Sequence, residues 1–351
     1  MKKLFPFIAF VFLIIMSLSA LADSGHNHQI QNNNYGVSGG NINDHTNAFC
    51  CSGTLGSLVQ DAGGAKYILS NNHVLARVDQ AAPGEDISQP GLIDNNCRAP
   101  RIVGDFFGKT PLGSNVDAAV ATLRSGTMNT NGIIQDVGTP SKTVRNPTVG
   151  LAVAKSGRTT GFTTGKISSV NTSVNVQYQK NCGSGKKFIV SYTNQVVINS
   201  SSFSAGGDSG SLIVSNTSST CRQPVALLFA GSSSTTIGNP IGQVLTKLGQ
   251  NTGKTYTFVG QTCTAAAATQ EMRSPSQAEI DRVITVLEGH RNNLMAQSAV
   301  IGVGVGHMAG DTTKAAIIVY MDKSQGTRAR LPRSIDGVPV RIISTDPFVA
   351  F

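Results

Sequence analysis

The glycine-rich segment Ser204-Ala205-Gly206-Gly207-Asp208-Ser209-Gly210-Ser211 carries the residues best suited to chemistry in this sequence. A serine hydroxyl is a poor nucleophile unless a base takes its proton, a carboxylate orients that base, and donors stabilise the developing oxyanion. The glycines let the backbone turn so that the Gly207 and Ser209 amides converge on one oxygen. Ser209 is therefore a candidate nucleophile for acyl transfer, although a Gly-Asp-Ser-Gly string is also a common loop sequence.

Two upstream segments supply a candidate base and a candidate carboxylate. The apolar run at 67–69 leads through three polar residues to His73, which we expect at a strand end beside the core. Asp117 stands directly before a second apolar run, where partial burial of its carboxylate requires a hydrogen-bonding partner such as an imidazole N–H. For His73 taken alone, the alternative interpretation is a structural histidine. For Asp117 taken alone, it is an aspartate in a surface turn.

The three residues occur in the order His73, Asp117, Ser209, at separations of 44 and 92 residues. This is the chain order of chymotrypsin-type enzymes and differs from the orders in subtilisin and the α/β-hydrolases. Cys51-Ser52-Gly53-Thr54-Leu55 precedes the histidine strand, and Lys155-Ser156-Gly157-Arg158-Thr159-Thr160-Gly161 follows later. On these motifs, residues 48–262 resemble the trypsin-like (chymotrypsin-fold) serine peptidases, nearest to the secreted bacterial branch of α-lytic protease and the streptogrisins.

The resemblance implies an all-β fold of two six-stranded antiparallel barrels with the site between them. It implies that Ser209 attacks a peptide carbonyl, His73 carries the proton, Asp117 holds the imidazole, and the Gly207 and Ser209 amides form the oxyanion hole. The residue matching Asp208 pairs in that family with a new N-terminus or with another internal cation. The expected function is a serine endopeptidase acting on polypeptides without a cofactor; the alternative is a catalytically silent, secreted protein-binding module.

Some positions depart from the family pattern and bear on specificity. Val74 stands where the family usually has cysteine, and Ser211 where it has glycine, but neither belongs to the triad. Phe203 occupies the position at the base of the primary pocket, so no counter-charge for Arg or Lys is expected there and a small or apolar preference follows. Ala230-Gly231-Ser232 looks like the strand that pairs with an extended substrate. An ordinary barrel edge is the alternative interpretation.

The first 22 residues are expected to be a signal peptide. Lys2 and Lys3 precede a ten-residue apolar run at 7–16, and Ala20 and Ala22 fit a cleavage site after residue 22. A spanning helix needs about 20 apolar residues, so no stable membrane anchor is expected. The sequence predicts an exported protein, secreted or periplasmic.

Export makes disulfides the default state of the six cysteines. We expect Cys97 to pair with Cys50 or Cys51, and Cys182 with Cys221, among the 15 pairings that six cysteines allow; this leaves Cys263 and one of the adjacent pair. Zinc is the competing interpretation, but the chain lacks C-x-x-C and H-x-x-x-H spacings, so no metal site is expected.

The remaining chain divides by composition. Residues 23–47 are polar and rich in Gly and Asn, which predicts a flexible lead-in in which the His26 and His28 pair is solvated. After a connector at 263–274, residues 275–351 predict a separate small α+β domain whose role is open, with docking, targeting or inhibition favoured. Its helix should have Ser274 as N-cap and an apolar face interrupted at Arg291, followed by strands at 300–305, 315–320 and 338–343.

The composition and the distribution of charge argue against nucleic acid as a partner. The chain has 351 residues, 40% of them hydrophobic and 13% charged, with a net charge of +9 that includes the two signal-segment lysines. Lys186-Lys187 is the only adjacent basic pair after that segment, and no aromatic platform accompanies it, so nucleic-acid binding is not expected. The alternating glycines at 302, 304 and 306 lack the Lys-Ser/Thr of a phosphate loop. Nothing in the sequence indicates an oligomeric state.

Overall fold

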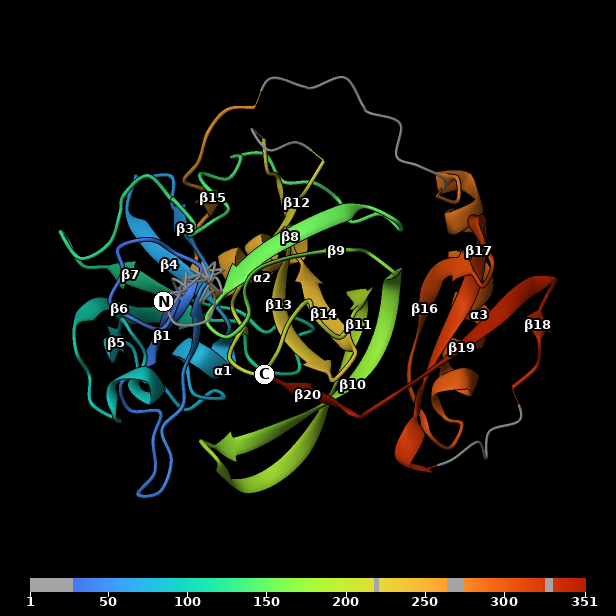
Figure 1. The fold of residues 1–351 in the computed structure, drawn as a ribbon, viewed down its shortest axis with the longest axis horizontal. Helices are drawn as coiled ribbons and strands as arrows, with labels where there is room; N and C mark the ends of the chain where they lie inside the picture. Colours follow the sequence, from blue (N-terminus) through green and yellow to red (C-terminus); the bar gives the residue numbers. More distant parts are fainter. Residues whose placement is uncertain (1–27, 218–220, 264–273, 326–330) are drawn as a thin grey trace, which may run out of the picture.

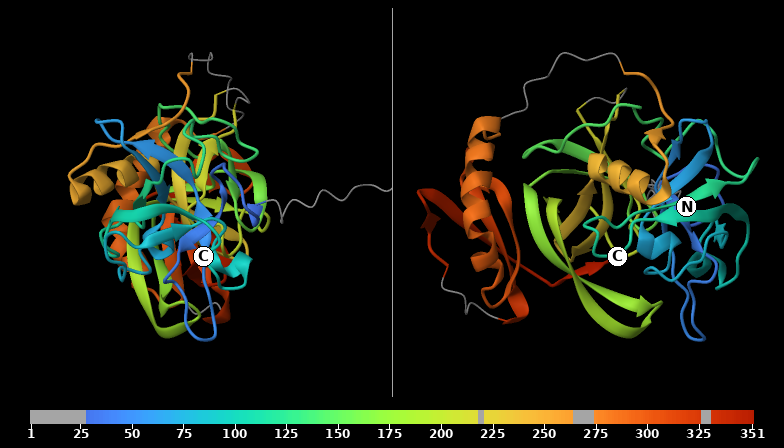
Figure 2. Two further views of the ribbon diagram at one scale, coloured as in Figure 1. Left: turned by 90° about the vertical axis from the view of Figure 1, so that its left-hand side faces the viewer. Right: turned by 180° about the vertical axis from the view of Figure 1, so that it is seen from behind.

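The strands build two antiparallel sheets side by side, with a helix-bearing region next to the second (Figures 1 and 2). The computed structural model describes residues 28–217, 221–263, 274–325 and 331–351. The expected signal peptide and positions 264–273 of the connector lie outside these ranges. The two-barrel antiparallel architecture expected from the resemblance is confirmed.

The first sheet is a closed barrel. Its strand order is β15-β3-β4-β7-β6-β5-β1-β2, and because only Gly56 separates β2 from β3, the last strand of that order returns to the second. A short helix, α1 (Asn72–Leu75), follows β4, and a 3-10 turn, η2 (Leu92–Asn95), follows β5. The strands are β1 (Val37–Asn41), β2 (Gly53–Leu55), β3 (Ser57–Gln60), β4 (Lys66–Ser70), β5 (Asp86–Ser88), β6 (Ile102–Lys109), β7 (Ala119–Leu123) and β15 (Thr257–Phe258).

The second sheet is an open half-barrel of seven strands in the order β10-β11-β14-β13-β12-β8-β9. Both this sheet and the eight-stranded first sheet therefore have more strands than the six expected of each. Two of them, β10 and β11, form a long hairpin that extends well beyond the sheet (Figure 1). The helix α2 (Ile241–Thr252), which the sequence analysis did not predict, packs against β13 and β6. The strands are β8 (Ala152–Gly157), β9 (Gly161–Lys166), β10 (Ser169–Asn181), β11 (Ser184–Asn199), β12 (Leu212–Ser215), β13 (Pro224–Ser232) and β14 (Thr235–Pro240).

The C-terminal region continues the second sheet, whereas the sequence predicts a separate domain. Strand β16 pairs with β10, and the order runs on through β17, β19 and β18. One apolar core also joins residues of this region, such as Val283 and Val303, to second-sheet residues such as Ile198. The elements are α3 (Gln277–Met295), β16 (Val300–Met308), β17 (Asp311–Asp322), the 3-10 turn η3 (Lys323–Gln325), β18 (Ser334–Ile335), β19 (Val338–Thr345) and β20 (Phe348–Ala350).

The alternating glycines of β16 explain how close this junction is. A Cβ atom at Gly304 would lie 2.3 Å from Thr172 Oγ1, and one at Gly306 would lie 2.4 Å from the Ser168 carbonyl oxygen. Glycine at these positions therefore allows β16 to approach β10. The helix α3 begins two residues later than predicted, because the Ser276 side chain, not that of Ser274, caps it by accepting a hydrogen bond from Glu279 N–H.

The described part of the lead-in is ordered, in contrast to the flexible segment predicted for 23–47. Strand β1 pairs with β2 and β5, and Tyr35 just before it is fully buried. His28 is also buried, where Nδ1 lies 3.0 Å from the Gly36 carbonyl oxygen and Nε2 lies 3.0 Å from Asp136 Oδ2. The polar composition hid this strand because it is buried on both faces, and its Gly39 and Gly40 carry no apolar side chain that would show this in the sequence.

Three disulfides involve all six cysteines. The pairing of Cys97 with Cys50 is one of the two expected, but the expected bond from Cys182 to Cys221 is wrong. Instead, Cys182 bonds Cys51 and Cys221 bonds Cys263. The long β10–β11 hairpin carries Cys182 across to the first barrel, which sequence separation alone did not indicate.

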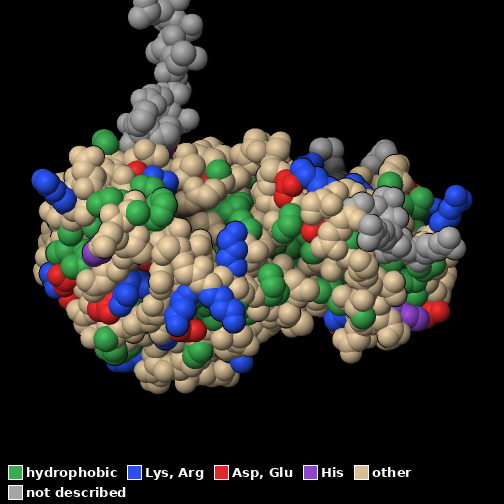
Figure 3. Space-filling view, turned by 90° about the horizontal axis from the view of Figure 1, so that it is seen from below, with side chains coloured by type: hydrophobic (Ala, Val, Ile, Leu, Met, Phe, Trp, Pro, Cys, Tyr) green, Lys and Arg blue, Asp and Glu red, His purple; other side chains and the backbone are tan. Residues whose placement is uncertain are grey.

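The surface seen from below carries Lys and Arg side chains spread among acidic and uncharged ones, with no continuous basic stripe on this face (Figure 3). In the described ranges, no helix is both long and apolar enough to cross a bilayer.

Candidate active site

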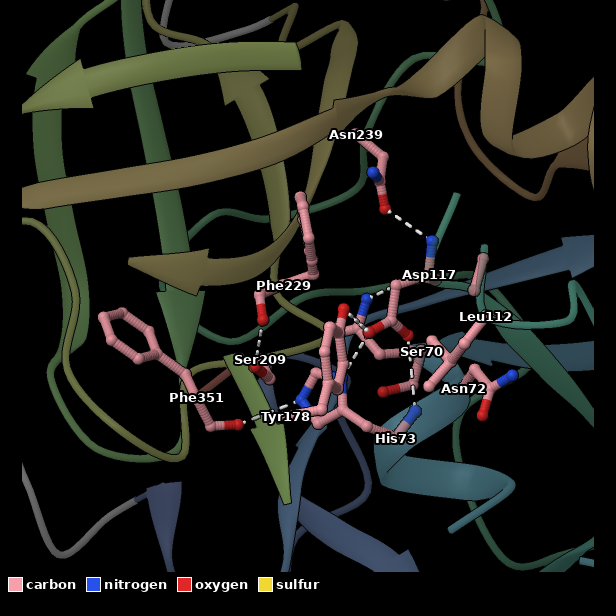
Figure 4. A network of polar contacts seen from close by, with 12 residues as sticks. Ser70, Asn72, His73, Leu112, Asp117, Tyr178, Ser209, Phe229, Asn239 and Phe351 are labelled. Carbon is pink, nitrogen blue, oxygen red and sulfur yellow. Dashed lines mark hydrogen bonds and ion pairs between the residues drawn. The ribbon is translucent and has the colours of Figure 1, made fainter. Parts of the chain in front are cut away.

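His73 and Asp117 are adjacent because of how β4 and β7 pair. These strands are antiparallel with Ser70 opposite Ala119, so the end of β4 and the start of β7 lie at one edge of the first barrel. His73 follows β4 within α1, and Asp117 lies two residues before β7. Ser209 comes from the second sheet, and its carbonyl oxygen accepts a hydrogen bond of 2.8 Å from the Thr54 N–H. Figure 4 shows the three side chains gathered between the two sheets.

The imidazole of His73 is bound to the carboxylate of Asp117. Nδ1 lies 2.6 Å from Asp117 Oδ2, and the His73 main-chain N–H donates to Oδ1 at 3.3 Å. The Asp117 side chain is 0% exposed and that of His73 only 10%. Burial alone would lower the pKa of His73, but the charge and hydrogen bond of Asp117 outweigh it, and the net pKa is raised.

The other ring nitrogen of His73 faces the C-terminal strand. Nε2 donates to the Phe351 carbonyl oxygen at 3.0 Å, so both ring nitrogens face acceptors, an arrangement that suits an imidazolium. The Ser209 hydroxyl donates instead to the Phe229 carbonyl oxygen at 3.2 Å. The expected Ser209–His73 hydrogen bond is therefore replaced by these two contacts, because the Phe351 carbonyl occupies the place at Nε2.

A tyrosine that the sequence analysis missed completes the surroundings of Asp117. The Tyr178 hydroxyl donates to Asp117 Oδ2 at 2.8 Å and lies 2.7 Å from the Tyr192 hydroxyl. Burial raises the pKa of Tyr178 well above its usual range, and the Asp117 charge adds to the effect, so the phenol stays protonated and donates. The signal was present in the alternation of Val174, Val176 and Tyr178, which marks an inward-facing tyrosine on β10.

The backbone of Asp117 is fixed as well. Its N–H donates to Asn239 Oδ1 at 3.0 Å, and its carbonyl oxygen accepts from Asn71 Nδ2 at 2.7 Å. Asn71 precedes α1 in the first barrel, whereas Asn239 belongs to β14 in the second sheet. The main chain of Asp117 is thus held from both sheets (Figure 4).

The loop that carries Ser209 is held by a buried ion pair. Asp208 Oδ2 lies 3.3 Å from Lys155 Nζ, and both side chains are 0% exposed. The Asp208 carboxylate also accepts from Thr160 Oγ1 at 2.6 Å and from the Thr159 N–H at 2.8 Å. Lys155 and these two threonines belong to the motif at 155–161, which therefore supplies the internal cation that the sequence left unidentified.

The conformation of the loop before Ser209 requires glycine at position 207. Gly207 adopts a φ of +97°, and a Cβ atom there would lie 2.5 Å from Thr159 Oγ1, so a side chain is excluded. Its carbonyl oxygen accepts from Thr54 Oγ1 at 3.0 Å, which fixes the orientation of the peptide. Within the described ranges, the N–H groups of Gly207 and Ser209 donate to no acceptor. Both remain available for a substrate oxygen.

The four residues predicted to bind substrate have different surroundings. Phe203 is fully buried in the core of the second sheet, where its ring packs toward Gly165, so its side chain does not form the floor of the open hollow nearby. Ala230, Gly231 and Ser232 lie at the end of β13, where β20 pairs with Ala230 and Gly231. A hollow of about 390 Å³ lies beside them, lined in part by Ser204, Ala205, Gly206 and Ser232.

A second hollow of about 340 Å³ lies on the other side of Phe351, lined in part by Asp44, Cys51, His73, Tyr178 and Cys182. Burial raises the pKa of Asp44 to about 6, against the opposing charges of His73 and Arg77. A hollow of about 990 Å³ lies away from these residues, between α3 and the second sheet. In the described part of the chain, no cluster of three or more His, Cys, Asp or Glu side chains is arranged to hold a metal ion.

Comparison with known proteins identifies the family. The model of peptidase family S64 matches residues 37–253, which is more than half of the chain. No curated protein matches the sequence. Similar solved structures include a glutamic acid specific serine protease, at 22% identity over 64% of this chain and 98% of that one with a TM-score of 0.44. They also include Thermobifida fusca protease A, at 19% identity over 60% and 92% of the two chains with a TM-score of 0.40. A Nocardiopsis protease matches at 19% identity over 59% and 92%, with a TM-score of 0.39. The chain belongs to peptidase family S64 and is a serine endopeptidase with a chymotrypsin-like fold.

Proposed function

We propose that this chain is an exported endopeptidase in which Ser209 is the nucleophile, His73 the general base and Asp117 the carboxylate that orients it. The observation that carries the proposal is the 2.6 Å contact between His73 Nδ1 and Asp117, on a ring whose Nε2 binds the Phe351 carbonyl oxygen. The Phe351 N–H and the Ser209 hydroxyl donate to the same Phe229 carbonyl oxygen. A substrate residue in the place of Phe351 would therefore lie next to both the hydroxyl and the ring.

The chemistry follows from these positions. With His73 neutral, a rotation of the Ser209 side chain directs the hydroxyl to Nε2, which takes the proton as the oxygen attacks the substrate carbonyl carbon. The Gly207 and Ser209 N–H groups then donate to the oxyanion. The imidazolium returns the proton to the leaving amine, and water hydrolyses the acyl-enzyme by the same route in reverse.

Asp117 favours this cycle because its charge stabilises the imidazolium that forms. The bond to Oδ2 also keeps the Nδ1 proton in place, so that Nε2 is the basic nitrogen in the neutral ring. The buried Lys155–Asp208 pair keeps the two oxyanion donors oriented.

The preference for small or apolar residues remains part of the proposal. The hollow beside β13 is lined by Ser204, Ala205, Gly206 and Ser232, which offer no charge to pair with Arg or Lys. Export is supported by the three disulfides together with the basic start and apolar run at the N-terminus.

Labelling with a fluorophosphonate tests the assignment of Ser209. The parent chain should be labelled and should hydrolyse casein, and Ser209→Ala should lose both properties while keeping its thermal unfolding midpoint. Ser202→Ala, an exposed serine in the same loop, is the matched control and should behave like the parent. Labelling that persists in Ser209→Ala would reassign the nucleophile. A folded chain that neither labels nor cleaves, with or without residues 348–351, would favour the silent binding module.

A further inference from the structure

The last strand of the chain lies across the candidate active site. β20 pairs antiparallel with β13, with Ala350 opposite Ala230 and Val349 opposite Gly231, and pairs parallel with β10 on its other side. In Figure 1 this strand leaves the C-terminal region and ends at the centre of the molecule. The part of β13 that it covers is the part predicted from sequence to pair with substrate.

The hydrogen bonds of Phe351 extend this pairing up to the catalytic residues. Its N–H donates to the Phe229 carbonyl oxygen at 3.3 Å, the same oxygen that accepts from the Ser209 hydroxyl. Its carbonyl oxygen accepts from His73 Nε2 at 3.0 Å. Figure 4 shows this carbonyl directed at His73 and the ring of Phe351 pointing away from it. The Phe351 carbonyl oxygen therefore occupies the position at Nε2 that the Ser209 hydroxyl must take to give up its proton.

The side chain of Phe351 occupies a defined place. Its ring packs against Gly231, where an added Cβ atom would lie 2.5 Å from the ring carbon Cζ. The ring also lines the hollow that contains Ser204, Ala205 and Ser232. This apolar and uncharged environment fits an aromatic side chain.

Residues before Phe351 hold the segment in place. Phe348 is buried and its ring meets that of Tyr320 edge-on, with centroids 5.8 Å apart. Asp346 accepts a hydrogen bond from Ser233 and pairs with Lys323 at 2.9 Å. With the segment bound, the Ser209 side chain is fully buried.

We infer that residues 348–351 are an intramolecular, substrate-like inhibitor of the Ser209 site, an inference that rests on the function proposed above. The substrates that this site prefers are then peptides with an aromatic residue in the place of Phe351. The segment blocks the ladder on β13, holds His73 through its Nε2 and covers the nucleophile. Activity requires its displacement.

Truncation after Pro347 tests the inhibition. The fluorophosphonate labelling rate is proportional to the fraction of molecules with an open site, so the truncated chain should label at least about tenfold faster than the full chain. Phe351→Gly, which removes only the ring, should accelerate labelling in the same direction and keeps the test decisive if the truncated chain does not fold. Ile342→Thr is the control, because Ile342 is 48% exposed on β19 and touches no part of the site. It should label at the rate of the full chain.

A binding measurement that does not depend on catalysis tests whether the hollow beside β13 accepts the Phe351 ring. Acetylated Phe-Val-Ala-Phe should bind to truncated Ser209→Ala protein and not to full-length Ser209→Ala protein, where the site is filled. Acetylated Phe-Val-Ala-Gly should bind at least about tenfold more weakly, since it lacks the ring that the hollow accepts. Isothermal titration calorimetry measures all of these affinities.

The outcomes separate the two proposals. Faster labelling together with selective peptide binding supports the inhibitor. A folded truncated chain that labels at the full-length rate and does not bind the peptide overturns it, while leaving the peptidase function intact. If neither chain labels, the assignment of Ser209 fails, and the peptide titration alone then decides the inference about the segment.

Discussion

The hydroxyl of Tyr178 offers a sharp test of how the site works, because it donates to the same Asp117 oxygen that binds His73. Tyr178→Phe removes that donor and keeps the ring. A hydrogen bond to a charged group contributes about 1.5–3 kcal/mol. Because Asp117 keeps both contacts to His73 but its carboxylate loses a group that fixes its orientation, we expect the less precise placement of the imidazole to cost the lower end of this range in the transition state. This corresponds to a decrease of about tenfold in kcat/KM.

The pH profile distinguishes this role from a structural one. Without the phenol donor, the negative charge of Asp117 is less neutralised and stabilises the imidazolium more strongly, so the pKa of His73 should rise further. Since activity requires neutral His73, the acid limb of kcat/KM should move to higher pH.

The matched control is Tyr192→Phe, which removes a hydroxyl that touches Tyr178 but not Asp117. Rates on a peptide nitroanilide between pH 5 and 9, with thermal unfolding of each variant, provide the measurement. If both variants have the same kcat/KM and the same acid midpoint, the proposed coupling of Tyr178 to His73 through Asp117 is refuted.

Three further predictions concern the residues around Ser209. Asp117→Asn should leave the thermal midpoint nearly unchanged but lower kcat by about 10⁴-fold, as the same change does in serine-peptidase triads; a loss below tenfold in a kinetic assay would remove Asp117 from its role. Lys155→Met leaves the Asp208 carboxylate buried without its cation and should lower the free energy of unfolding in urea by about 3–5 kcal/mol. The exposed-site control Lys166→Met should change it by less than about 0.5 kcal/mol, and equal effects of the two substitutions would contradict the importance of the pair. Because the pKa of His73 is raised above 6.5, activity should fall as pH decreases through a midpoint above that value, and a rate that is flat from pH 5 to 8 would contradict its role as base.

The sequence was sufficient to predict the parts of the site that local chemistry determines. His73, Asp117 and Ser209 each stand at the end or start of an apolar run, and the pairing of β4 with β7 brings the first two together. The motif at 155–161 was recognised from the resemblance, although its contact with Asp208 required the fold.

Long-range features were harder to predict. Tyr178 reaches Asp117 only because the β10–β11 hairpin is far longer than a typical strand pair, and the same length carries Cys182 to Cys51. The C-terminal region has its own helix and strands, which predicts an independent domain. Its junction with β10 depends on small residues at 302, 304 and 306, whose role becomes clear only when the opposing strand is known.

The connection between β19 and β20 is only two residues long, Asp346 and Pro347, and this has a consequence for the strength of binding that the final strand needs. A ligand on so short a tether experiences an effective concentration of millimolar order or higher, so weak intrinsic affinity is enough to keep the cleft filled. The same four residues on a separate molecule would have to compete from solution without that advantage. Occupancy should therefore be the same in dilute and concentrated samples, and a competing polypeptide would need many more contacts than the tail itself makes.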